Sequence, residues 1–201
     1  MARLPARIRN QVLAQTRQRL LDAAILEFAR VGYVGASINR ISKAAGFAQG
    51  TIYNYFPSKC ALMVAVIDHI AAAHTETILK QVMAETHSAQ RLECFFRAGF
   101  VFVEARPAQA QIIVNVVYGP DIELKEHIYL AYAPLFRLIE QDILKAGVAQ
   151  GEFQKMNCDL VTALIMAMYL GSSSQLDACG KIQLDPADVT RFILDGLRRR
   201  N

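Results

Sequence analysis

The stretch Ser37–Lys59, SINRISKAAGFAQGTIYNYFPSK, decides the fold of the amino-terminal part of this 201-residue chain. Ser37 stands where a helix N-cap belongs, and Gly46 interrupts the apolar pattern after one short helix. A second short helix follows, with Ile52 and Phe56 on its buried side. The stretch therefore predicts two short helices around a glycine turn, which is a helix-turn-helix.

The second of these helices carries hydrogen-bonding groups on its exposed face. In a helix-turn-helix unit this helix enters the major groove of DNA. Tyrosine hydroxyls can bind phosphates there, and amides such as Asn54 can bind base edges. A glycine at the start of the helix lets the protein backbone come close to a DNA phosphate. The alternative, a helical subdomain with an ordinary polar face, stays open. The candidate DNA-binding residues are Ser37, Arg40, Gln49, Gly50, Thr51, Tyr53, Asn54, Tyr55 and Lys59.

In the rest of the chain, too, the apolar residues recur with the period of a helix. Before the helix-turn-helix, Leu21, Ala24, Ile25 and Phe28 follow a helical spacing, and Gly32 is a suitable stop. After the helix-turn-helix we expect one helix over 59–84, a second that ends at 106 before Pro107, and a short third that ends at 118. We expect further helices over 123–146, with a kink or break at Pro134, over 159–178 and over 185–200. No stretch alternates like a strand. The predicted fold class is all-α.

The charges are divided unevenly along the chain. Residues 1–60 hold nine Lys and Arg residues against two acidic ones, whereas the remaining residues hold thirteen against sixteen. A basic head on a mildly acidic body indicates a polyanionic partner, although basic surfaces also serve solubility. An arm over residues 1–14 with Arg3, Arg7 and Arg9 either reaches the minor groove or is a solvated tail.

Composition excludes several classes of protein. Hydrophobic residues make up 53% of the chain, which supports a large core. No apolar run approaches about 18 residues, because the stretch 61–67 stops at Asp68 and the stretch 163–170 ends at Gly171 and three serines. We therefore expect a soluble cytoplasmic protein without a membrane span. The four cysteines lie far apart, which disfavours disulfides and zinc sites, and we expect no metal and no cofactor.

Residues from about Arg17 to Ile67 resemble the amino-terminal domain of the TetR family of transcriptional repressors. The resemblance rests on ILEFARVGY (25–33) with Ser37, on ISKAAG (41–46), and on GTIYNYFPSK (50–59) with Leu62. It implies that phosphates meet Ser37, Tyr53, Tyr55 and Lys59, and that bases meet Gln49, Gly50, Thr51 and Asn54. It also implies a larger helical domain that binds a small molecule and dimerises. We therefore expect an arm over 1–14, a DNA-binding domain over 15–60 and a ligand-binding and dimerisation domain over 61–201.

The last two predicted helices carry small and apolar residues along one face each. Such faces suit a four-helix interface between two copies of the chain, which would read a palindromic operator in double-stranded DNA. The alternative is that they pack internally. The candidate dimerisation residues are Ala163, Ala167, Leu170, Ser174, Val189, Phe192, Ile193, Gly196 and Leu197.

The aromatic-rich middle of the chain either lines a ligand cavity or forms simple core packing. Few charges lie there, so the predicted effector is small and hydrophobic, and Gly99 is a candidate for leaving it room. The candidate ligand-binding residues are Phe96, Phe100, Val103, Tyr118, Tyr132, Phe136 and Met166.

The sequence thus predicts a ligand-responsive repressor in which ligand binding moves the helix 59–84 and changes the spacing of the two recognition helices. One rival is a helical module that binds RNA or protein through its basic arm. The other is an enzyme, but His69 and His74 do not share a helical face, and nothing local supports Cys94 with His127 as nucleophile and base.

Overall fold

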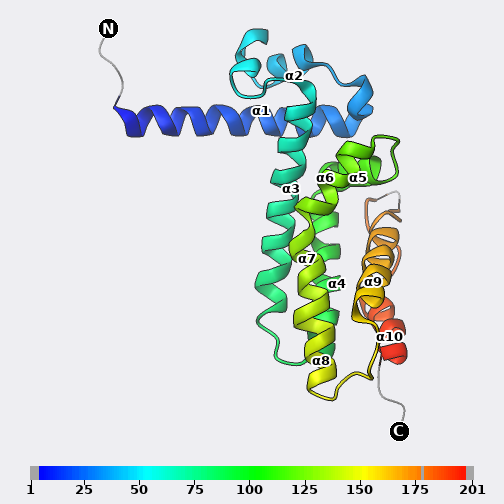
Figure 1. The fold of residues 1–201 in the computed structure, drawn as a ribbon. Coiled ribbons are helices and arrows are strands. Elements are labelled where there is room, and N and C mark those ends of the chain that lie inside the picture. Colours follow the sequence, from blue (N-terminus) through cyan, green and yellow to red (C-terminus); the bar gives the residue numbers. More distant parts are fainter. Residues whose placement is uncertain (1–4, 178, 198–201) are drawn as a thin grey trace. The chain divides into compact units, whose positions relative to one another are not determined.

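The computed structural model describes residues 5–177 and 179–197, and its helices are shown in Figure 1. Contacts divide the chain into two compact units, one ending at His69 and the other beginning at Ile70. The described residues contain no strand, only an isolated bridge between Leu176 and Ile182. The all-helical prediction is confirmed.

The first unit is built from α1 (Ala6–Gly35), α2 (Ile38–Ala44), the 3₁₀ helix η1 (Gln49–Asn54) and the start of α3 (Lys59–Val82). Two glycines end helical runs here as the sequence predicts. Gly32 has φ of +70° and kinks α1, and Gly46 has φ of +79° in the turn after α2. Side chains from all four helices form the core of this unit, namely Leu21, Phe28, Ile41, Ile52, Phe56 and Leu62.

Capping explains where α3 begins. The backbone N–H of Ala61 donates to Ser58 Oγ at 3.0 Å, so Ser58 caps this helix. Ser37 also precedes a helix, but its hydroxyl makes no capping bond. The recognition helix, by which we mean η1, is a 3₁₀ turn and not the short α-helix that the apolar spacing predicts.

The second unit contains the rest of α3 and the helices from α4 onward. They are α4 (Ser88–Ala105), α5 (Pro107–Val117), α6 (Ile122–Ala131), α7 (Ala133–Arg137), the π-helical η2 (Leu138–Lys145), α8 (Ala146–Ala149), α9 (Cys158–Ser173) and α10 (Pro186–Leu197). Its core is aromatic and aliphatic, with Phe95, Phe96 and Leu135 fully buried. Helix α7, labelled in Figure 1, continues directly into η2. Helix η2 packs on α4, and α10 lies against α4 as well.

Two helix boundaries differ from the sequence prediction, whereas the break predicted at Pro134 is present. The segment 123–146 is divided after Ala131, because Pro134 in the first turn of α7 has no N–H with which to continue the ladder of α6. Helix α9 ends at Ser173, earlier than predicted. Helix α1 begins at Ala6, so Arg7 and Arg9 are helical, whereas Arg3 and the chain after Leu197 lie outside the described residues.

Helix α3 is long and apolar enough to span a membrane by length and composition, with a mean hydropathy of 1.3 in its best window. Every such window contains Asp68, which the sequence analysis treated as an interruption. Half of the window is buried inside the protein. Core helices of soluble proteins have the same pattern, so it is weak evidence for a membrane span.

Candidate DNA-binding and ligand-binding sites

The recognition helix exposes its polar side chains and buries its apolar ones. Ile52 is 1% exposed, whereas Tyr53 is 50% exposed, and Gln49, Gly50 and Asn54 are exposed as well. A side chain added at Gly50 would meet nothing within 4 Å, so the start of this helix stands open to an approaching surface. Thr51 and Tyr55 are half-buried at the edges of this face.

A buried carboxylate holds the start of α2 against α1. Glu27 accepts hydrogen bonds from the Ser37 N–H at 3.2 Å, from Arg40 Nε at 2.7 Å and from an Arg30 guanidinium N–H at 2.9 Å. Burial alone would raise the pKa of Glu27, but these hydrogen bonds keep that pKa below its ordinary value. Ser37 and Arg40 are therefore fixed by a residue that the sequence analysis did not select.

Two predicted phosphate-binding cations also make contacts within the protein. Arg40 donates to the carbonyl oxygen of Gly35 at 2.8 Å. Lys59 Nζ donates to the carbonyl oxygens of Val34 and Ala36, and lies 5.0 Å from the centre of the Tyr33 ring. Both side chains thus brace the link between α1 and α2, and the guanidinium of Arg40 stays about half exposed.

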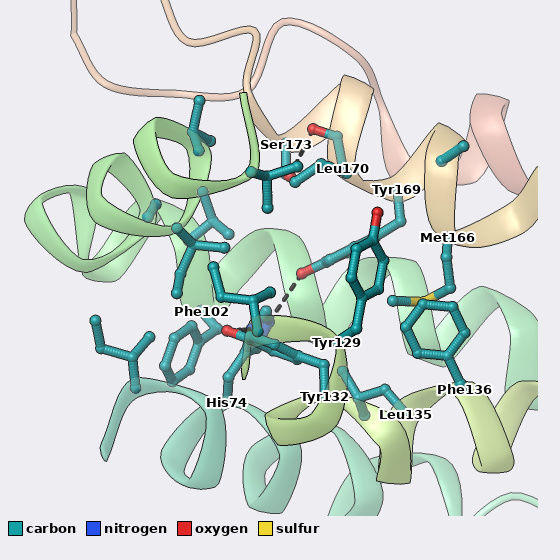
Figure 2. A pocket seen from close by; sticks show the side chains of 18 of the residues that line it. His74, Phe102, Tyr129, Tyr132, Leu135, Phe136, Met166, Tyr169, Leu170 and Ser173 are labelled. Atoms are coloured by element: carbon teal, nitrogen blue, oxygen red, sulfur yellow. Dashed lines mark hydrogen bonds between the residues drawn. The ribbon is translucent and has the colours of Figure 1, made fainter. Parts of the chain in front are cut away.

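The second unit contains a cavity of about 440 Å³ (Figure 2). Side chains from α3, α4, α5, α6, α7 and α9 line it, together with Tyr118 and Tyr132 between helices. Within residues 5–177 and 179–197, no Lys, Arg, Asp or Glu is among the lining side chains. The predicted ligand-binding residues that line the cavity are Val103, Tyr118, Tyr132, Phe136 and Met166.

The wall of the cavity holds one polar cluster, His74 between two tyrosines. Tyr132 Oη lies 3.3 Å from His74 Nδ1, and Tyr169 Oη lies 2.8 Å from Nε2. Phe102 stacks on the imidazole with ring centres 4.3 Å apart. Figure 2 labels the residues of this cluster. Burial, and then the charge of Arg106, lower the pKa of His74 to about 4, so the imidazole is neutral at physiological pH.

Two of the predicted ligand-binding residues do not line the cavity. Phe96 and Phe100 are buried and pack on each other edge to face, with ring centres 5.9 Å apart. Both also contact the ring of Tyr169, so they support the cavity wall from behind. The expectation that Gly99 makes room for a ligand is wrong as well, since a Cβ there would overlap the Tyr169 hydroxyl.

The predicted dimerisation residues fall on two different sides of α9 and α10. Val189, Ile193 and Leu197 are buried, and α10 packs along α4 of the same chain, so these three belong to the protomer core. Phe192 is 74% exposed and Gly196 is exposed beside it. On α9, the predicted residues Ala163, Ala167 and Ser174 are exposed and Leu170 is half-buried. Ala163, Ala167 and Leu170 also line the cavity.

Sequence reasoning missed several residues that the fold brings to these sites. Leu160 and Leu164 extend the exposed face of α9, with 57% and 55% of their surface exposed. A signal for His74 was present, because it shares a buried helical stripe with Ile70 and Ile78. No group of three His, Cys, Asp or Glu residues that could hold a metal ion occurs in the described part of the chain.

The sequence is similar to many known bacterial regulatory proteins. Residues 20–66 match the model of the tetR family of bacterial regulatory proteins. The chain is 35% identical to NicS, an HTH-type transcriptional repressor of Pseudomonas putida, over 96% of this chain and 97% of that protein.

Solved structures share the fold of nearly the whole chain. The fatty acid degradation regulator FadR of Bacillus halodurans aligns with a TM-score of 0.81 and 22% identity, over 92% of this chain and 97% of that one. FadR of Bacillus subtilis in complex with stearoyl-CoA aligns with a TM-score of 0.77 and 19% identity, over 89% of this chain and 95% of that one.

Proposed function

This chain belongs to the TetR family of bacterial regulatory proteins and is a DNA-binding transcriptional regulator, and from that premise we propose how it works. It acts as a dimeric repressor that binds a palindromic operator through two recognition helices. It leaves the operator when a small apolar molecule occupies the cavity of the second unit. The observation that carries the proposal is the exposed polar face of the recognition helix above a fully buried Ile52.

We assign the DNA contacts by the chemistry of each exposed side chain. Tyr53 and Tyr55 bind phosphates through their hydroxyls, which fixes the register without reading sequence. Gln49, Thr51 and Asn54 meet base edges in the major groove. Gly50 lets the protein backbone approach a phosphate. We assign Ser37, Arg40 and Lys59 to DNA backbone phosphates on either side of the recognition helix. The hydrogen bonds that Ser37 and Arg40 donate to Glu27 support this assignment, because they fix the geometry of α2 before DNA binds.

We propose that the exposed faces of α9 and α10 meet those of a second copy. Leu160, Leu164 and Phe192 expose large apolar surfaces, and Ala163 and Gly196 are small enough for close helix approach. A helix-turn-helix of this size reads paired half-sites about 34 Å apart, so two copies are required. The interface consists of the outer residues of both helices, and the inner residues of α10 belong to the protomer core.

Helix α3 is the proposed link between ligand and operator. Its first residue, Lys59, donates a hydrogen bond to the carbonyl oxygen of Val34 in the first unit. Its later residues Ile70 and His74 line the cavity. A ligand that shifts these side chains shifts the helix and changes the spacing of the recognition helices. Coupling of about 1–3 kcal/mol per site lowers operator affinity by one to two orders of magnitude.

We assign repression to this protein from its similarity to a repressor, and an apolar effector from the lining of its cavity. NicS is named as a repressor, which supports repression here. The uncharged lining of the cavity supports an apolar effector, and it offers no cation for the phosphates of a ligand such as the stearoyl-CoA of the Bacillus subtilis structure. We assign no catalytic residue, and we place the protein in the cytoplasm with the DNA it regulates.

Selection from a random pool of duplexes tests this proposal. The full-length protein is expected to enrich an inverted repeat with half-site centres about one helical turn apart. The Asn54→Ala variant, with an unchanged fold by circular dichroism, is expected to enrich a less defined motif. Enrichment of no duplex, or of RNA from a parallel pool, would show that the proposed function is wrong.

A further inference from the structure

The cluster of Tyr132, His74 and Tyr169 is a buried polar feature of an uncharged cavity wall, which also carries the hydroxyl groups of Tyr118, Tyr129 and Ser173. All three side chains are buried, and Figure 2 shows both hydroxyls directed at the imidazole. Hydrogen bonds can be counted for this cluster, because each group has a fixed number of donors and acceptors.

A neutral imidazole has one N–H donor and one nitrogen acceptor. The pKa of about 4 keeps His74 neutral at pH 7, so it donates to one tyrosine and accepts from the other. The tyrosine that accepts from His74 keeps its own O–H. Neither hydroxyl has another partner among the described residues, so one phenol O–H of the cluster remains for a ligand or for water. Leaving such a buried donor unpaired is costly.

The packing identifies Tyr132 as the residue that keeps this O–H. The Tyr169 hydroxyl lies against Gly99, where even a Cβ would overlap it, and it makes the shorter bond to His74. We therefore take Tyr169 as the donor to Nε2, an assignment that places the proton of His74 on Nδ1, on the side of Tyr132. The hydroxyl of Tyr132 then accepts from Nδ1 and aims its hydrogen into the cavity.

The surroundings of the cluster also exclude anions. The charge of Arg106 acts on His74, but its guanidinium lies 4.4 Å from the centre of the Phe102 ring and is not part of the cavity lining. Phe102 in turn stacks on His74, so an aromatic ring separates the charge from the cluster. A carboxylate or phosphate in the cavity would be desolvated without a cation to pair with, which disfavours its binding.

We propose that the effector is an uncharged, largely apolar molecule with one hydrogen-bond acceptor, a carbonyl oxygen or ring nitrogen, that takes the O–H of Tyr132. This rests on the proposed role of the cavity as the effector site. The acceptor satisfies a buried donor, and the apolar remainder fills about 440 Å³ among aromatic and aliphatic side chains.

Matched probes test the proposal on the full-length protein by isothermal titration calorimetry. In a naphthyl series these are 2-acetylnaphthalene, 2-ethylnaphthalene and 2-naphthoate, and in an octyl series 2-decanone, decane and nonanoate. In each series that binds, the ketone is expected to bind about tenfold more tightly than the hydrocarbon, because it pairs the donor. The carboxylate is expected to bind more weakly than either.

Two variants locate the donor. Tyr132→Phe is expected to reduce the ketone preference to about onefold, because a bound hydrocarbon then leaves no donor unpaired, and Tyr169→Phe is the matched control that keeps most of the preference. The carbonyl stretch of the bound ketone, measured by infrared spectroscopy in the unmodified protein, is expected at lower frequency than in hexane. This readout does not depend on how a variant folds.

Equal affinity for ketone and hydrocarbon, tighter binding of the carboxylate, or binding of no probe in either series would overturn the proposal. So would a Tyr132→Phe protein that keeps the full preference, or a carbonyl stretch at its hexane frequency. None of these measurements involves DNA, so their failure leaves operator binding standing. Loss of operator binding would likewise leave the ligand measurements intact.

Discussion

Replacing Glu27 by alanine removes the acceptor that joins α1 to the start of α2. Arg30 and Arg40 are 61% and 54% exposed, so each of the two ion pairs contributes at most about 1 kcal/mol. The N–H of Ser37 also loses its partner, which costs about 1 kcal/mol for a half-buried group. We therefore expect Glu27→Ala to lower the free energy of unfolding by about 2 kcal/mol at pH 7.

The pH dependence of this effect follows from the depressed pKa of Glu27. The folded-state pKa lies below the ordinary value of 4.5, so the stabilisation is fully present above that value. It is lost as the pH falls through the folded-state pKa, where the carboxyl group becomes protonated. The difference between the unmodified protein and Glu27→Ala should therefore be constant from pH 6 to pH 8 and shrink below pH 4.5.

Urea denaturation of the full-length protein, followed by circular dichroism, measures this difference. Asp22→Ala is the matched control, because Asp22 is an exposed carboxylate on the same helix with a hydrogen bond from Gln18. We expect the control to change stability by less than about 0.5 kcal/mol. An equally small change for Glu27→Ala, or a difference that persists unchanged below pH 4, would refute the reasoning.

The remaining predictions concern the recognition helix, the dimer face and the cavity wall. Tyr53→Phe should weaken binding to operator and random duplexes alike in electrophoretic shift assays, and a loss confined to the operator would contradict a phosphate role. Asn54→Ala should lower operator affinity by about 1–3 kcal/mol while sparing random DNA, and equal losses on both would reject base reading. Phe192→Glu should raise the dimer dissociation constant at least about a hundredfold in sedimentation equilibrium, and an unchanged constant would remove α10 from the interface. Gly99→Ala should lower thermal stability by about 1–3 kcal/mol because the new methyl group displaces Tyr169, and an unchanged melting temperature would contradict this tight packing.

Sequence reasoning worked best in the first unit, where local signals decide the structure. Gly32 and Gly46 adopt positive φ where the apolar pattern breaks, and Ser58 caps α3 as its position predicts. Glu27 could not be found in this way. Its partners Ser37 and Arg40 lie ten and thirteen residues away, and such a separation carries no helical periodicity.

The second unit shows why an apolar pattern alone does not assign faces. Helix α10 has apolar residues on two sides, and the fold buries Val189 and Ile193 against α4 while leaving Phe192 exposed. Helix α4 is buried over most of its circumference, so its period does not reveal that Phe102 and Val103 face the cavity while Phe96 lies behind it. Deciding between such faces requires the neighbouring helices.

The affinity of the full-length protein for two duplexes tests the central claim most directly. One duplex carries the selected inverted repeat, and the other has one half-site scrambled at the same length. We predict that scrambling lowers affinity at least about a hundredfold, and that raising salt from 50 to 200 mM weakens binding at least about tenfold. Equal affinity for the two duplexes, or binding indifferent to salt, would contradict a paired recognition helix acting on duplex DNA.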